Sequence, residues 1–160
     1  MEMEVEMLSI RDSVAVITGG SGGIGKVLAE YWLSKGGKVV NADVAEEALR
    51  ATEQELKKIS TNVASIVCEV TSEEDNARLA DAAIEKFGQL NLVAPFAGII
   101  KDAMMVSPDR ETGKVTRKME LADFQKVLDI NITGVFLTIR ECSEQMINHG
   151  CRGLICLVSS

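Results

Sequence analysis

One glycine-rich stretch constrains the fold of this chain more than any other feature. It reads TGGSGGIG (18–25), directly after an apolar run (SVAVIT) and directly before a helical pattern. Gly19 permits a tight turn out of a strand, Gly23 leaves room for a pyrophosphate beside the backbone, and Gly25 lets a helix pack closely. The free amides that begin such a helix carry about half a unit of positive charge. The stretch therefore predicts a strand, turn and helix that bind phosphate groups.

Apolar runs alternate with helical patterns along the rest of the chain. The runs are apolar nearly throughout, as in parallel strands that helices cover on both faces. The expected strands are 13–18, 38–43, 63–70, 90–94 and 153–159, and the expected helices are 24–35, 46–59, 73–87 and 121–148. Strand-helix alternation implies right-handed crossovers. The sequence predicts an α/β fold in one domain, a doubly wound parallel sheet that is truncated after the fifth strand.

Two segments lie outside this alternation. Residues 1–10 (MEMEVEMLSI) are an acidic lead-in where a signal peptide would be basic and then apolar. Residues 101–118 are polar, with Pro108 and Gly113 as turn signals, and we interpret them as an inserted surface loop or small hairpin. Ligands in open α/β sheets bind outside the carboxyl ends of the strands. The insertion is therefore either a flap on the substrate side or a passive surface feature.

Charge and cysteine content bound the class of function. The net charge is −7, from 17 basic and 24 acidic residues, whereas nucleic-acid-binding proteins carry a basic face. No run of 18 apolar residues is present to span a membrane. His149 is the only histidine, and it has no zinc-like spacing to any of the four cysteines. We expect a cytoplasmic protein with reduced thiols, no metal site, and no nucleic-acid or membrane partner.

An acid at the end of the second predicted strand extends the phosphate-binding interpretation. Asp43 lies 20 residues after Gly23, close to the spacing of a carboxylate that binds a ribose. Each hydrogen bond from a ribose hydroxyl to the carboxylate contributes about 1.5–3 kcal/mol. The same charge repels a 2′-phosphate, and no Arg or Lys stands in the glycine turn or directly after Asp43. These residues favour NAD as the cofactor over NADP; a structural glycine turn with a capping aspartate is the alternative.

Five segments, in order, resemble motifs of the short-chain dehydrogenase/reductase family over residues 10–160. They are the glycine turn, Glu69-Val70, Ala97-Gly98, Asn131 in NITGVF, and Ser159-Ser160. The resemblance implies that Glu69 and Val70 hold an adenine. It implies a cofactor-binding set of Gly19, Ser21, Gly22, Gly23, Ile24, Asp43, Val44, Glu69, Val70, Ala97 and Gly98. It also implies two catalytic residues, Asn131, which anchors a water, and Ser160, which hydrogen-bonds the reacting oxygen.

The chain departs from the family pattern in two places. Pro95 and Phe96 replace the two asparagines that precede the Ala-Gly pair in the family, so the side-chain bonds of those asparagines cannot form. The family's catalytic Tyr and Lys follow the serine by a dozen or so residues and lie beyond Ser160. The Tyr-x-x-x-Lys of this sequence, Tyr31 to Lys35, is instead expected on the first helix, running away from the phosphates. We interpret that pair as part of a helix surface.

The resemblance implies an NAD(P)-binding Rossmann domain over residues 1–160 of an oxidoreductase. Such an enzyme interconverts a secondary alcohol and a ketone, with a 3-oxoacyl thioester among the candidate small-molecule substrates. In the family, the helix corresponding to 121–148 packs in dimers and tetramers, so a homo-oligomer, for example a homotetramer, is implied. Two interpretations stay open. Either the chain is the amino-terminal part of such an enzyme and inactive alone, or it is a catalytically dead nucleotide-binding or interaction module.

Overall fold

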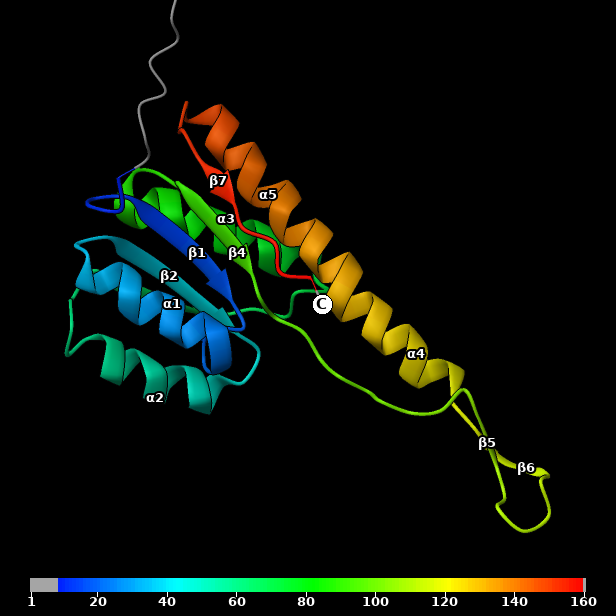
Figure 1. The fold of residues 1–160 in the computed structure, drawn as a ribbon. Coiled ribbons are helices and arrows are strands. Elements are labelled where there is room, and N and C mark those ends of the chain that lie inside the picture. Colours follow the sequence, from blue (N-terminus) through cyan, green and yellow to red (C-terminus); the bar gives the residue numbers. More distant parts are fainter. Residues whose placement is uncertain (1–8, 160) are drawn as a thin grey trace, which may run out of the picture.

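The computed structural model describes residues 9–159. The first eight residues of the expected lead-in, and Ser160, the expected catalytic serine, lie outside the described residues. A parallel sheet in the order β3-β2-β1-β4-β7 forms the centre of the molecule (Figure 1). Its strands are β1 (Val14–Thr18), β2 (Lys38–Asp43), β3 (Val63–Val67), β4 (Leu92–Pro95) and β7 (Leu154–Ile155). The chain winds outward from β1 to β3 and returns to β4 on the other side of β1, so the predicted doubly wound parallel sheet is confirmed.

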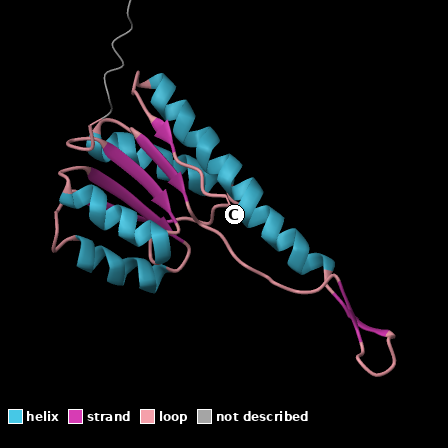
Figure 2. Cartoon of the chain, in the orientation of Figure 1, coloured by secondary structure: helices cyan, strands magenta, loops and turns pink. Residues whose placement is uncertain are grey.

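Helices cover both faces of the sheet (Figure 2). Alternate residues of β1 face opposite cores: Val14 and Val16 belong to one buried cluster, and Ala15 and Ile17 to the other. The helices α1 (Gly23–Ser34) and α2 (Glu46–Leu56) supply the second cluster, and α3 (Glu73–Phe87) and α5 (Val135–Asn148) the first. Strands that are buried on both faces require continuous apolar runs, which explains why the sequence pattern located them.

A continuous helical segment spans residues 121–148. It consists of α4 (Leu121–Leu128), the π-helix η1 (Asp129–Gly134) and α5. The predicted single helix over 121–148 is therefore interrupted by a π-helical turn, which widens the backbone around Asn131. Such turns are rare and occur frequently at functional sites. None of the helices in the described residues is both long and apolar enough to span a membrane.

Two strands are shorter than the apolar runs predict by three residues or more. The third ends at Val67 rather than residue 70, because the chain turns where the Ser72 amide bonds the Glu69 carbonyl at 2.9 Å. The fifth spans only Leu154–Ile155 rather than 153–159. Its partner β4 ends at Pro95, which has no N–H to continue the ladder. Apolar composition predicted extended backbone there, but a strand also requires a partner at the same level.

The polar insertion at 101–118 contains the antiparallel hairpin of β5 (Val106–Pro108) and β6 (Val115–Lys118). Asp109 shapes its turn by accepting bonds from the Thr112 amide and hydroxyl, both at 2.8 Å, and these bonds hold the pKa of Asp109 below its ordinary value. Figure 1 shows the hairpin projecting beyond the amino end of α4, far from the central sheet. In this position it is not folded over the strand ends.

Candidate functional site

A cavity of about 550 Å³ lies at the carboxyl ends of the strands. It lies between the glycine turn, Asp43, the segment 95–98 and the π-helix residue Asn131. A smaller cavity of about 140 Å³ continues from it between Val44, Glu69, Val70 and Ile130. The two cavities share Gly19, Asp43, Ala97 and Gly98. Together they form one elongated site across β1, the strand at which the winding direction reverses, where ligands of open α/β sheets bind.

The glycine turn needs its glycines for two different reasons. Gly19 has a φ of +65°, and a Cβ there would lie 2.8 Å from the Ala97 nitrogen, so a side chain has no room. Gly25 allows α1 to meet the turn itself, because a Cβ would lie 2.4 Å from the Gly19 carbonyl oxygen. At Gly22 and Gly23, in contrast, a Cβ would meet nothing within 4 Å. Those two glycines leave space open to the cavity at the amino end of α1.

Side chains from β2 and α2 hold the carbonyl groups of the glycine turn. The Asn41 amide nitrogen donates to the Gly20 oxygen at 2.9 Å, and the Thr52 hydroxyl donates to the Ser21 oxygen at 3.2 Å. Asn41 is completely buried. The turn is therefore anchored from behind, with its carbonyls engaged by the protein. No side chain in the described residues caps the amino end of α1, which keeps that end of the helix open to a ligand.

Asp43 stands at the junction of the two cavities. One carboxylate oxygen accepts from the Ser21 amide and the other from the Ala45 amide, each at 3.1 Å. These bonds fix the carboxylate beside the glycine turn. Because a carboxylate oxygen accepts more than one hydrogen bond, both oxygens keep capacity for hydroxyl donors of a ligand.

The wall of the larger cavity opposite the glycine turn consists of residues 95–98 and Asn131. Other hydrogen bonds stabilise it in place of those of the two asparagines that Pro95 and Phe96 replace. The Ala97 amide donates to the Thr18 hydroxyl at 3.2 Å, which joins the ends of β1 and β4. Phe96 packs against the core under α1 and α2. The Asn131 amide group binds the Ile99 main chain through both of its ends, each at 2.9 Å. Both ends of the Asn131 side chain are thereby engaged, so its role in anchoring a water stays a prediction.

The smaller cavity has an apolar floor and a polar rim. Val70 is buried. A Cβ added to Gly134 of η1 would lie only 2.7 Å from the Val70 Cγ2 atom. The Glu69 carboxylate turns back to accept bonds from the Thr71 amide and hydroxyl, at 3.3 and 3.1 Å. The smaller cavity therefore lies between Val70, Gly98 and Ile130.

The structure brings together all of the predicted site residues that it describes. Every residue of the predicted cofactor set lines one cavity or both, and Asn131 lines the larger. Ser160 lies outside the described residues. Tyr31 is half exposed on α1, with the Lys35 ammonium 5.4 Å from its ring centre, and neither residue lines a cavity.

Some residues of the site were missed by sequence reasoning. Val135 and Val158 line the larger cavity, and Thr18, Asn41 and Thr52 hold its walls. Thr18 directly precedes the first glycine, so its place at a strand end was available as a signal. The contacts of Asn41 and Thr52 join residues 21 and 31 positions apart, and no local pattern marks such contacts.

The fold and this site define an α/β protein with a glycine-turn pocket at the switch point of its sheet. The family model for short chain dehydrogenases matches residues 13–160. The chain belongs to the short-chain dehydrogenase family.

The chain is similar in sequence and in structure to individual known proteins. Zerumbone synthase from Zingiber zerumbet is 31% identical over 140 residues, which cover 88% of this chain and 49% of that protein. (+)-Borneol dehydrogenase 2 from Salvia officinalis is 34% identical over 140 residues, 88% of this chain and 46% of that protein. A short chain dehydrogenase/reductase from Burkholderia phymatum in complex with NAD superposes with a TM-score of 0.78 at 30% identity, over 93% of this chain and 49% of that chain. The chain spans about half the length of the curated relatives it matches.

Proposed function

We propose that this chain is the nicotinamide-cofactor-binding portion of an oxidoreductase that interconverts a secondary alcohol and a ketone. One observation carries the proposal: an open glycine turn at an uncapped helix end shares a cavity with a carboxylate and with the Ala97-Gly98 segment. The bound cofactor would accept or donate the hydride. The chain's own residues bind the cofactor, orient it and separate its adenine end from its reactive end.

The residues of the two cavities fit a dinucleotide. Gly22 and Gly23 leave the space that a pyrophosphate needs, beside amides that favour an anion. Asp43 stands where the two cavities meet and would accept the hydroxyls of the adenosine ribose. The smaller cavity, which Val70 and Gly98 line, would receive the adenine ring. The nicotinamide end would then lie toward Asn131 and Val158 in the larger cavity.

NAD is the preferred cofactor in this proposal. Of the described residues that line the two cavities, none is Lys or Arg. A 2′-phosphate on the ribose would bring its charge beside the Asp43 carboxylate without a compensating cation. The NAD complex of the Burkholderia phymatum relative supports the same choice.

The proposed substrate class is supported by a relative's name and by the lining of the larger cavity. One relative is named (+)-borneol dehydrogenase 2, and the larger cavity presents apolar Phe96, Val135 and Val158. We propose a small secondary alcohol and ketone pair, with Ser160 binding the reacting oxygen and Asn131 holding the wall beside it.

A homo-oligomer is part of the same proposal. Apolar residues follow one another at helical spacing along α4, η1 and α5, and they are exposed: Leu121, Phe124, Leu128, Ile132 and Phe136. A second copy of the chain would cover such a stripe. The family's dimers and tetramers, implied by the resemblance, use the corresponding helix.

Binding and turnover test the proposal separately. NADH and NADPH are titrated into the protein at its natural length and followed by cofactor fluorescence, and secondary alcohols with NAD are then screened by absorbance. We expect NADH to bind at least about tenfold more tightly than NADPH, from the loss of one charged contact. Absence of binding for both cofactors would refute the proposal. Binding without turnover of any alcohol or ketone would favour the catalytically dead module.

A further inference from the structure

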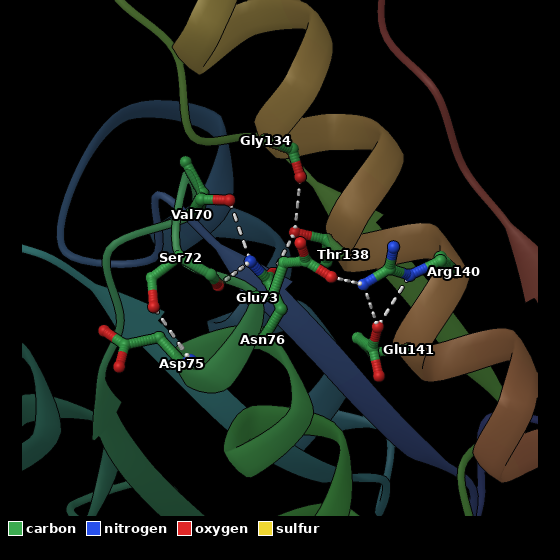
Figure 3. Close-up of polar contacts among 9 residues, drawn as sticks. All are labelled: Val70, Ser72, Glu73, Asp75, Asn76, Gly134, Thr138, Arg140 and Glu141. Atoms are coloured by element: carbon green, nitrogen blue, oxygen red, sulfur yellow. Dashed lines mark hydrogen bonds and ion pairs between the residues drawn. The ribbon is translucent and has the colours of Figure 1, made fainter.

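A buried polar bridge lies behind the wall of the smaller cavity, where α3 meets α5 (Figure 3). The Asn76 amide nitrogen donates to the Val70 and Ser72 carbonyls, both at 2.8 Å. The Asn76 oxygen accepts from the Thr138 hydroxyl at 2.7 Å, and that hydroxyl also lies 2.9 Å from the Gly134 carbonyl. Asn76 is 0% exposed and Thr138 1% exposed. The polar atoms of both side chains are fully partnered within the protein.

The bridge joins two segments that form the cavity wall. At one end it holds the loop Glu69–Ser72, whose Val70 lines the smaller cavity. At the other end it reaches the last residue of η1, the π-helix that carries Asn131 into the larger cavity. Among the described residues, neither Asn76 nor Thr138 lines either of these two cavities. Their contacts therefore act on the site through Val70 and Gly134.

Stability alone is a poor reason for polar groups in this place. A buried amide contributes little net stability when bonded, and it destabilises the fold when one partner is lost, whereas an apolar pair of similar shape packs at nearly no cost. The surrounding cluster is apolar, with Leu79, Ala80 and Cys142 as its neighbours on the two helices. The polar pair fixes the direction and position of the Val70 and Ser72 carbonyls, which an apolar pair cannot do.

We propose that Asn76 and Thr138 are positioning residues that set the adenine side of the cofactor site. The proposal rests on the proposed function, because it assigns the smaller cavity, which Val70 lines, to the adenine. The Val70 carbonyl follows the end of β3 and has no strand partner, so Asn76 supplies the bond that fixes its peptide group. When this bond is held, the Val70 side chain lies against Gly134 and forms part of the lining of the smaller cavity, against which the ring would pack.

The chain provides a matched control for this bridge. Arg140 of α5 pairs with Glu73 of α3 on the exposed side of the same helix interface, and with Glu141 (Figure 3). Arg140→Ala removes this exposed link between the helices and touches neither the loop nor η1. Thr138→Val removes the hydroxyl with little change of shape, and Thr138→Ser keeps it.

The test combines ligand affinity with hydrogen exchange in the protein at its natural length. ADP-ribose is used as the probe because it carries the adenine end without the nicotinamide. We expect Thr138→Val to weaken ADP-ribose and NADH by the same factor, about tenfold, and Thr138→Ser and Arg140→Ala to stay within about twofold of the wild type. Amide exchange of 69–72 should quicken in Thr138→Val only.

The double variant Asn76→Leu/Thr138→Val separates positioning from stability. It leaves no unpaired side-chain group, so the melting temperature should recover toward the wild type while ADP-ribose affinity stays weak. Recovery of both quantities, or an unchanged affinity in Thr138→Val, would overturn the proposal. If the wild type binds neither ADP-ribose nor NADH, the proposed function fails. The exchange of 69–72 then decides alone whether the pair positions this loop.

Discussion

Two alanine substitutions in the glycine turn separate its structural role from its ligand role. Gly25→Ala places a methyl group 2.4 Å from the Gly19 carbonyl oxygen and 3.1 Å from the Gly20 Cα atom. Both contacts are backbone, so no side chain can rotate away. Overpacking of this kind costs about 3 kcal/mol at the upper end of its range, and the better helix propensity of alanine returns about 1 kcal/mol. The net loss is about 2 kcal/mol.

Gly22→Ala is the opposite case. Gly22 has an extended backbone, with φ of −162° and ψ of −179°, and its added methyl would meet no protein atom within 4 Å. The stability of this variant should stay within about 0.5 kcal/mol of the wild type, because alanine's poorer capping is offset by the smaller entropy of its unfolded chain. The methyl instead occupies cavity space that a pyrophosphate needs.

Thermal melting and NADH titration of the two variants give the comparison. For a chain of this size a loss of 2 kcal/mol lowers the melting temperature by about 4–8 °C, so Gly25→Ala should melt earlier and Gly22→Ala should not. NADH affinity should fall at least about tenfold in Gly22→Ala. Normal affinity in that variant would refute the placement of the phosphates beside Gly22.

Three further outcomes are expected. Asp43→Ala should weaken NADH by about tenfold or more and NADPH much less, since only the unphosphorylated ribose uses the carboxylate; equal losses in fluorescence titrations would contradict this role. Burial raises the pKa of Cys68 and of Cys142 to about 12, so at pH 8 only about one thiol in ten thousand is ionised and neither should react with a thiol reagent before unfolding. Residues 1–160 expressed alone should self-associate through the exposed apolar α4–α5 stripe and the β7 edge; a sharp monomer peak in light scattering would count against it.

The parts of the fold that depend on local pattern could be read from the sequence. Apolar runs located the first four strands because helices cover both faces of the sheet, and the glycine turn marked the start of α1. The fifth strand was predicted too long, since its length depends on where β4 ends in space. The π-helix was missed because nothing in the helical pattern over 121–148 distinguishes one extra residue per turn.

The candidate site shows the same division. Its glycines and Asp43 could be predicted from their spacing along the chain. Asn76 and Thr138 do not, because they meet across 62 residues of sequence and each alone is an ordinary polar residue in a helix. The bonds of Asn131 to Ile99 join residues 32 positions apart. Only the folded chain shows that these bonds stabilise the cavity wall in which Pro95 and Phe96 replace two asparagines.

A crystal structure of the protein at its natural length, grown with NADH, tests the central assignment most directly. The account predicts the pyrophosphate within hydrogen-bonding distance of the amides at 22–24, the adenosine ribose on the Asp43 carboxylate, and the adenine against Val70. A dinucleotide bound away from the glycine turn, or a ribose turned away from Asp43, would contradict it.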